Sequence, residues 1–301
     1  MHMLPRDIQE TNERRFSRNH INGYIKQAIN DSEDIQSKVD LGVSLLQSWL
    51  EKDYYKSKNK RLEQLKTLDL RQLVTDMFVG IAYIQQPQLF VSVTSQLAAK
   101  LNFADHRAAI LTVAEITAVI CETDAFDITK DSPEASLMLI SRLTLPKAIL
   151  EAIERSMYQP PMVCQPEDIQ SNFESPYLTF NDSQILGKKN SHEGDICLDV
   201  INIQNKIELE LDTEFLCNVE EVPNHALDTY EKLQQWQTFK DQSYGLYHLL
   251  VKQGNSFYLT NKVDKRGRLY SQGYHVTSQG TCFKKAMLEL KNKETVTGVP
   301  V

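Results

Sequence analysis

Three prolines, Pro160, Pro161 and Pro166, stand within seven residues, and they constrain the fold more than any other feature of the sequence. Proline fixes its own φ angle, lacks an N–H donor, and disfavours helical backbone at the residue before it. Residues 159–166 are therefore expected to be extended, and no helix should cross them. The sequence thus predicts a change of architecture at this point, with a separate domain over residues 1–158.

Apolar residues before the prolines recur at helical spacing, and glycine is scarce, with 11 in 301 residues. Asp31-Ser32-Glu33 and Asp69 are suited to cap helices, and each is followed by an apolar face. The two faces comprise Ile35, Val39, Leu46 and Trp49, and then Leu73, Val74, Met77 and Ile81. The domain over residues 1–158 is therefore expected to be helical.

Four more segments of this domain carry helix signals. Apolar blocks over residues 89–101 and 108–119 and the segment 146–157 favour helices, while the charged residues 54–66 favour a solvated helix face or a loop. Ser132-Pro133-Glu134 predicts a further helix start, with serine at the N-cap and proline at the first helical position.

The pattern after the prolines is mixed. Residues 167–195 are polar and are expected to form a loop. Apolar and polar residues alternate over residues 196–200 and again over residues 207–211, a period that by itself predicts strands. Residues 227–251 return to helical spacing, residues 257–263 are strand-like, and residues 282–293 have the pattern of an amphipathic helix.

The charge distribution is uneven. The chain carries a net charge of −7, yet residues 252–293 contain nine Lys and Arg against Asp264 and Glu289. A basic segment on an acidic body would confine phosphate contacts to one face. No apolar stretch reaches the roughly 18 residues that cross a bilayer, no secretory signal opens the chain, and five widely spaced cysteines match neither a disulfide framework nor a zinc site. A cytosolic protein without membrane contact or a metal of its own is expected.

The segment Asp264-Lys265-Arg266-Gly267-Arg268-Leu269-Tyr270 carries the clearest chemical signal. Two arginines separated by glycine suit a tight turn that presents guanidinium groups to phosphate, because arginine binds phosphate with two parallel hydrogen bonds and glycine lets the backbone approach. The competing interpretation is a surface β-turn whose arginines pair with nearby carboxylates.

Downstream of this turn stand Ser278-Gln279-Gly280 and then Lys284-Lys285 at a helix start. The block resembles the start of the palm in single-subunit, phage-type RNA polymerases, which have an Asp-x-Arg-Gly-Arg-x-Tyr turn, a Pro-Gln-Gly element and a lysine that opens a helix. Upstream, the proline segment 161–166 is similar to that family's Pro-Met element, and Tyr177-Leu178 to its Gly-Gly-Tyr-Leu, with Ser175-Pro176 in place of the glycines.

Residues 202–216 resemble the family's Asn-x-x-Gln-x-x-x-Trp-x-Ile-Asn helix. Asn205 stands in the place of Gln, Leu209 in that of Trp, and Leu211-Asp212 in that of Ile-Asn. The resemblance covers residues 160–293 in the family's order. It implies a helix over residues 196–219, in place of the strands that the alternation predicts.

The resemblance implies a role for each matching residue. Residues expected to contact phosphates of the template or the nascent RNA are Lys265, Arg266, Arg268, Lys284 and Lys285. Residues expected to support that site are Asp264, Gly267, Tyr270, Gln279 and Gly280. Asp264 would hold the turn and would not bind a metal.

The implied fold is mainly α. It has a helical N-terminal domain over residues 1–158, a proline-rich segment and helix over 159–218, a reduced helical thumb over 219–253, and the α+β start of a palm over 254–301.

The family's two Mg²⁺-binding aspartates lie in Asp-x-Ser-x-Gly and His-Asp stretches, and this chain contains neither stretch. The resemblance therefore implies the N-terminal subunit of a heterodimeric, DNA-directed RNA polymerase, acting in the cytoplasm of a bacterial host. A partner chain would bind Mg²⁺ and carry the fingers. The assembled enzyme would bind template DNA and nascent RNA. A promoter-specificity factor or a single-stranded-DNA-binding factor is a possible further partner.

Two other interpretations stay open at this point. The chain could be a piece of one longer polymerase, which the sequence of a partner would decide. It could instead be a non-catalytic, helical nucleic-acid-binding accessory factor of phage transcription or replication, which would bind DNA alone and need no polymerase partner.

The purified chain alone should make no RNA, because both metal-binding aspartates are expected on another chain. Incorporation of labelled ribonucleotides on single- and double-stranded templates measures this, and the chain that co-purifies should carry both aspartate stretches. RNA synthesis by the rigorously purified single chain would contradict the split-enzyme interpretation.

Overall fold

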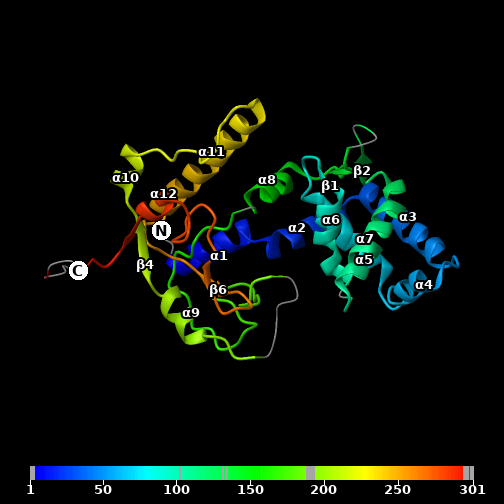
Figure 1. Ribbon diagram of the computed structural model, residues 1–301, viewed down its shortest axis with the longest axis horizontal. Helices are drawn as coiled ribbons and strands as arrows, with labels where there is room; N and C mark the ends of the chain where they lie inside the picture. The colour runs from blue at the N-terminus through cyan, green and yellow to red at the C-terminus, as the bar shows by residue number, and fades with distance from the viewer. Residues whose placement is uncertain are drawn as a thin grey trace. The chain divides into compact units, whose positions relative to one another are not determined.

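The computed structural model describes residues 4–101, 103–130, 132, 135–156, 158–187, 194–293 and 298 (Figure 1). About half of the chain is helical and the strands form small antiparallel sheets, which confirms a mainly α or α+β fold. The chain forms two compact units, one of residues 18–154 and one of residues 1–17 together with 155–301. Within the described part of the chain, every helix is too short or too polar for a bilayer crossing.

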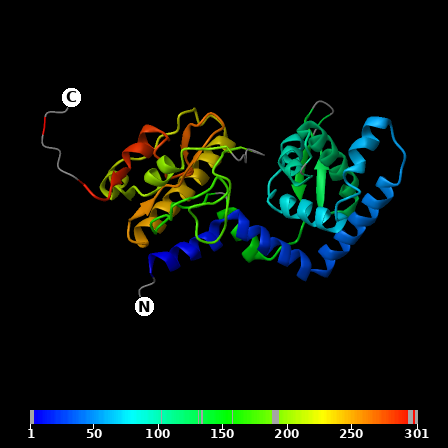
Figure 2. The ribbon, with the colours of Figure 1, turned by 90° about the horizontal axis from the view of Figure 1, so that it is seen from below.

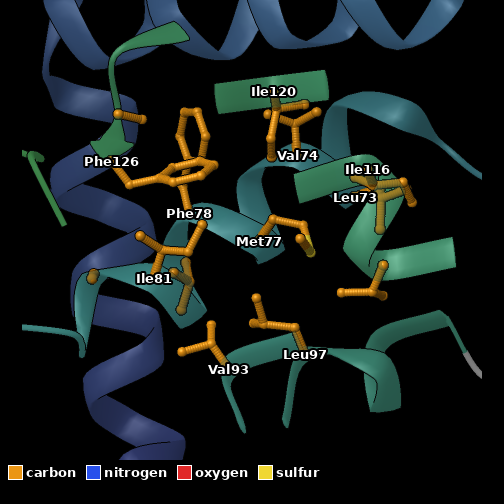
Figure 3. Packing of buried hydrophobic residues seen from close by; sticks show 14 of the residues in the cluster. Leu73, Val74, Met77, Phe78, Ile81, Val93, Leu97, Ile116, Ile120 and Phe126 are labelled. Carbon is orange, nitrogen blue, oxygen red and sulfur yellow. The ribbon is translucent and has the colours of Figure 1, made fainter. Parts of the chain in front are cut away.

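The unit of residues 18–154 is a helical domain with one apolar core. Its elements are α2 (Arg18–Asp31), α3 (Glu33–Leu50), α4 (Lys56–Glu63), α5 (Leu70–Ala82), β1 (Gln88–Leu89), α6 (Phe90–Leu97), η1 (Ala98–Leu101), α7 (His106–Ile120), η2 (Cys121–Thr123), β2 (Phe126–Thr129), β3 (Met138–Ser141) and α8 (Lys147–Arg155). Figure 3 shows Met77 and Phe78 of α5 at the centre of this core, between side chains of α6 and α7.

Helix starts in this unit follow the predicted caps. The Ser32 hydroxyl accepts a hydrogen bond from the Ile35 N–H, and the Asp69 carboxylate accepts one from the Gln72 N–H. All eight residues of the two predicted apolar faces are buried. Capping satisfies amide donors that the first helical turn leaves free, and burial of one face supplies most of a helix's stability in a protein.

One predicted helix of this unit is wrong. Pro133 and Glu134 of the expected start lie outside the described residues, and the chain after them forms β3. β3 lies between β1 and β2 in an antiparallel sheet, with Leu139 fully buried. Pairing on both sides satisfies the backbone of residues 138–141, so the local helix signal does not decide their structure.

The other unit is α+β. Its elements are α1 (Pro5–Phe16), α9 (Leu198–Asn205), β4 (Glu208–Leu211), α10 (Thr213–Asn218), α11 (Tyr230–Lys252), β5 (Phe257–Tyr258), β6 (Asn261–Val263), β7 (Leu269–Ser271), α12 (Cys282–Ala286) and β8 (Leu288–Leu290). The predicted extended proline segment is present, because Met162 and Tyr258 exchange two backbone hydrogen bonds of 3.0 and 2.7 Å. The predicted helix over residues 227–251 is α11.

β4 is the central strand of a sheet ordered β5-β4-β8, and it corrects two predictions. The helix expected over residues 196–219 is broken into α9, β4 and α10, so the alternation of Leu209 and Leu211 was the correct signal. The helix expected over residues 282–293 stops at Ala286, and β8 follows it. β4 needs a partner on each edge, and the pairing of Leu209 with Leu290 supplies one of them.

α1 is attached to this unit through a buried carboxylate. Glu13 is fully buried, and its oxygens accept hydrogen bonds from the Leu178 N–H at 3.0 Å, the Thr179 N–H at 2.8 Å and the Thr179 hydroxyl. In Figure 2, α1 (blue) runs along one margin of the unit. Hydrogen bonds to a charged acceptor are about twice as strong as neutral ones, so Glu13 holds the loop at residues 177–179 in place.

The turn over residues 273–276 should tolerate no side chain at its first position. A Cβ on Gly273 would lie 1.7 Å from the Val276 carbonyl oxygen, whereas a Cβ on Gly245 of α11 would meet no atom within 4 Å. We expect Gly273→Ala to lower the free energy of unfolding by about 2 kcal/mol or more, because backbone must move. Urea denaturation followed by circular dichroism measures the change.

Gly245→Ala is the matched control for this substitution. Alanine favours a helix over glycine, so the variant should be neutral or more stable by up to about 1 kcal/mol. Equal stability of the two variants would contradict the geometry of the turn.

Candidate nucleic-acid interface

The Arg-Gly-Arg segment forms the tip of a β-hairpin. β6 and β7 pair antiparallel with Val263 opposite Leu269 and Asn261 opposite Ser271, and residues 264–268 connect them. Gly267 has φ of +79°, a backbone conformation that glycine adopts without the strain a side chain would cause. The predicted tight turn is therefore present, with glycine at the position that requires it.

Asp264 holds this turn together. Its Oδ1 accepts hydrogen bonds from the N–H groups of Arg266 at 2.9 Å and Arg268 at 3.0 Å, and Oδ2 accepts from the Arg268 Nε at 2.8 Å. Desolvation alone would raise the pKa of Asp264, but hydrogen bonds from the Arg268 backbone and guanidinium and from the Arg266 backbone lower it to about 2. The carboxylate thus stays ionised across the physiological range. It holds the turn, which is the role that the family resemblance implies for Asp264.

The two arginines differ in their surroundings. The Arg268 guanidinium is already engaged, with Nη2 at 2.6 Å from Asp264 Oδ2 and its carbon 5.6 Å from the Tyr270 ring centre. The Arg266 side chain is 72% exposed, and its Nε lies 3.5 Å from the same carboxylate oxygen. Lys265 is exposed beside it. Arg266 and Lys265 are therefore the cations of the hairpin that are least engaged within it, and Arg268, with its side chain 53% exposed, also shapes the tip.

Gln279 supports the hairpin from outside. Its Oε1 accepts a hydrogen bond from the Ser271 N–H at 3.1 Å, and its Nε2 donates to the Leu269 carbonyl at 3.0 Å. One side-chain amide thus serves the free edge of β7 as a third strand would, by pairing with both a donor and an acceptor of the backbone. Gln279 lies where a supporting residue was expected.

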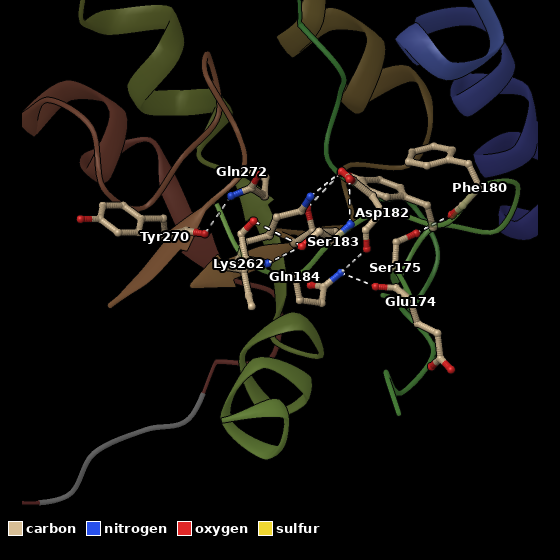
Figure 4. A network of polar contacts seen from close by, with 12 residues as sticks. Glu174, Ser175, Phe180, Asp182, Ser183, Gln184, Lys262, Tyr270 and Gln272 are labelled. Carbon is tan, nitrogen blue, oxygen red and sulfur yellow. Dashed lines mark hydrogen bonds and ion pairs between the residues drawn. The ribbon is translucent and has the colours of Figure 1, made fainter. Parts of the chain in front are cut away.

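A polar network supports the base of the hairpin from the loop over residues 174–186 (Figure 4). The Lys262 ammonium of β6 forms an ion pair with the Asp182 carboxylate, and the Gln184 side chain donates to the Glu174 carbonyl. Val263 donates its N–H to the Gln184 carbonyl at 3.0 Å. Lys262 is a charged residue that sequence reasoning missed, because nothing local distinguishes a lysine that will pair in a loop contact from an exposed one.

Asn205 is a second residue that the sequence did not single out for this contact. It is buried at the end of α9, and its Oδ1 accepts hydrogen bonds from the backbone N–H and the side-chain amide of Asn261 at 2.8 and 3.1 Å. Asn261 opens β6, so α9 sets the position at which the hairpin leaves the core. The similarity of residues 202–216 to the family's helix was the only sequence signal near it.

The two lysines of α12 do not share one environment. Lys284 is buried and donates its ammonium hydrogen to the Tyr274 carbonyl at 2.8 Å, so α12 does not present it on the outer surface. Gly280 permits this, because a Cβ there would lie 2.7 Å from the Lys284 Cδ. Lys285 is exposed. Helical geometry separates neighbouring residues by about 100°, so only one of two adjacent lysines can face solvent fully.

His275 is a buried histidine behind this helix. Its Nδ1 lies 2.7 Å from the Ser243 hydroxyl of α11, and its Nε2 is buried without a hydrogen-bond partner. Burial, helped by the positive charge of Lys284, lowers the pKa of His275 to about 4. The imidazole is therefore neutral in the folded protein at neutral and mildly acidic pH.

The arrangement is suited to binding anions. The hairpin presents a guanidinium and an ammonium at a rigid tip, and among the described residues no three His, Cys, Asp or Glu side chains are grouped to hold a metal ion. Mg²⁺ thus remains an expectation about a partner chain. Comparison of the sequence with protein-family models and with curated proteins finds no match.

The buried His275 should make the unit less stable in acid. Its folded pKa lies below the ordinary value of 6.5, so between about pH 6.5 and 4 the unfolded chain takes up a proton that the folded chain refuses. The free energy of unfolding should fall across this window by an amount on the order of 3 kcal/mol from this group.

Denaturant titrations at several pH values test this expectation. His275→Gln should show a shallower fall between pH 6.5 and 4, whereas His248→Gln, at an exposed position of α11, should keep the slope of the unaltered protein. Identical slopes in all three proteins would contradict a neutral, buried His275.

Proposed function

We propose that the chain is the N-terminal subunit of a heterodimeric, phage-type DNA-directed RNA polymerase, and that its β6–β7 hairpin holds phosphates of the template strand or nascent RNA. The observation that carries the proposal is the hairpin tip. Asp264 and Gly267 fix a turn from which Arg266 and Lys265 project into solvent. Guanidinium groups match phosphate oxygens in geometry and charge, and a rigid tip loses little entropy on binding.

The segments that resemble the polymerase family meet around this hairpin, which supports the proposal. Met162 of the proline segment pairs with Tyr258 of β5, just before the hairpin. Asn205 of the family-like helix binds Asn261 at the start of β6, and Gln279 binds the edge of β7. Motifs scattered over more than a hundred residues thus contact either the hairpin or the strand β5 just before it, as parts of a common site would.

Catalysis in this proposal belongs to the partner chain. The partner would carry both aspartates and the Mg²⁺ ions that promote nucleotide transfer, and this chain would position nucleic acid. The enzyme would work in the cytoplasm of a bacterial host. Removing the partner would leave the hairpin able to bind nucleic acid but unable to extend RNA.

Apolar surface on this unit is consistent with such a partner. Val222 is 78% exposed and Leu290, on the edge strand β8, is 56% exposed. An open, largely apolar groove between α10 and α12 is lined by Phe215, Val219, Val222, Phe283 and Ala286. Leaving this much apolar surface in water is unfavourable, and β8 also presents unpaired backbone on one edge. A subunit that continues the sheet from β8 would cover both.

Arg266→Ala should reduce RNA synthesis by the assembled enzyme about tenfold or more. A charge-assisted hydrogen bond contributes about 1.5–3 kcal/mol, and Arg266 makes little contribution to the turn itself. Arg268→Ala should have at least the same effect, since it also removes the guanidinium bonds to Asp264. Transcription on a defined template and subunit co-purification are measured together.

Arg6→Ala is the matched control, because Arg6 is an exposed arginine of the same unit that pairs with Glu167. It should transcribe normally. The Arg266→Ala enzyme should also lose about one unit of the salt dependence of binding, as expected for one phosphate contact. Normal transcription by the Arg266→Ala enzyme, or a defect due only to failed assembly, would refute the proposed role.

A further inference from the structure

A second group of side chains in the same unit surrounds a pocket of about 360 Å³ next to α11, separate from the hairpin tip. Trp236 and Phe239 of α11 line it, together with Tyr274 of the turn over residues 273–276 and Lys284 of α12. This volume lies at the small end of the range that holds organic ligands, about 300–1,000 Å³. The hairpin function uses none of these four side chains.

Two stacked pairs of aromatic rings meet at this pocket. Trp236 stacks on Phe239 with ring centres 5.3 Å apart, and Tyr274 stacks on Tyr158 at 4.7 Å. The rings of Phe239 and Tyr274, one from each pair, are nearly perpendicular at 83°. Tyr274 is 53% exposed and Trp236 is half-buried, so each pair keeps one ring partly open to solvent. Open, rigidly held ring faces bind other flat rings by stacking.

A cation lies where the two stacks meet. The Lys284 ammonium is 5.1 Å from the ring centre of Phe239 and 4.8 Å from that of Tyr274. An ammonium has three donors, and the Tyr274 carbonyl takes one of them. Burial lowers the pKa of Lys284, and the carboxylate of Glu221, which also lines the pocket, opposes that effect. The Lys284 ammonium is largely removed from water, so water screens its charge poorly and the ammonium attracts anions strongly.

Polar side chains complete the wall. Lys232 and Gln235 of α11 line the pocket, with Asn224 from the segment before the helix. Side-chain amides carry both donors and acceptors, which is the pattern on the edge of a nucleobase. The pocket therefore combines flat apolar faces, amide groups, the Glu221 carboxylate and two ammonium groups, of which that of Lys232 also pairs with Asp228 at 2.7 Å.

We infer that this pocket binds one unpaired nucleotide of a single strand, with its base stacked on an open aromatic face and its phosphate near Lys232 and Lys284. Stacking on aromatic side chains together with backbone cations is how proteins hold single strands without reading sequence. The inference rests on the pocket's own side chains and extends the proposed function from phosphates at the hairpin to a base at α11. An acidic, aromatic segment of a partner protein is the competing occupant.

The test measures binding of the full chain to a fluorescently labelled octauridylate, and to an abasic octamer with the same number of phosphates. Trp236→Ala should weaken octauridylate binding about tenfold and leave abasic binding unchanged. Trp236→Phe should restore most of the loss, because it keeps a ring. Tyr230→Ala is the matched control, since Tyr230 is an exposed aromatic of the same helix outside the pocket.

The outcomes separate this inference from the polymerase role. Arg266→Ala should weaken binding of both octamers, because it acts on phosphate. Equal octauridylate binding by the unaltered, Trp236→Ala and Tyr230→Ala proteins would overturn the base pocket, whatever the result for Arg266. Failure of the unaltered chain to bind octauridylate would also overturn the base pocket. A Trp236→Ala protein that binds octauridylate normally but loses its co-purifying partner would overturn it too, and would mark the pocket as a protein-docking site.

Discussion

β4 pairs with β5 on one side and with β8 on the other, and both candidate sites depend on this arrangement. β5 leads through two residues into β6, so its pairing positions the hairpin that carries Arg266. β8 follows α12 directly, so its pairing positions Lys284 at the aromatic pocket. A central strand with both edges satisfied cannot shift its register without exposing Leu211, which is buried. The phosphate-binding tip and the pocket are therefore held by the same short sheet.

Local polar contacts complete what the sheet begins. Asp264 closes the hairpin tip, Gln279 covers the edge of β7, and Asn205 holds the start of β6. Each of these three side chains hydrogen-bonds to backbone groups of the hairpin that its two short strands leave without a partner. The tip is rigid for this reason, and rigidity is what a cationic site needs if binding a phosphate is to cost little conformational entropy.

The hairpin and the pocket have complementary chemistry. The hairpin tip presents mainly charge, whereas the pocket presents aromatic faces with a buried cation. A single strand offers both phosphates and unpaired bases, so one ligand could satisfy both sites. The apolar groove between α10 and α12 differs from each of them, because it offers neither cations nor stacked rings, and it suits a protein partner.

The sequence by itself determined the features that depend on near neighbours. Proline geometry set the extended segment at residues 159–166, caps at Ser32 and Asp69 started their helices, and the Arg-Gly-Arg segment formed the predicted turn, because each acts within a few residues. Strand alternation was correct around Leu209 and wrong at residues 198–200, whereas the helix that the family resemblance implies is present at α9 and α10 and wrong at β4.

Only the tertiary structure decided the rest. β3 and β8 are strands because distant segments of the chain pair with them. Lys284 is buried because Gly280 leaves space for its side chain and the Tyr274 carbonyl accepts its hydrogen bond. Glu13 and Lys262 found their partners about 165 and 80 residues away. Contacts of that range leave no periodic trace in the sequence, because they depend on how complete elements pack.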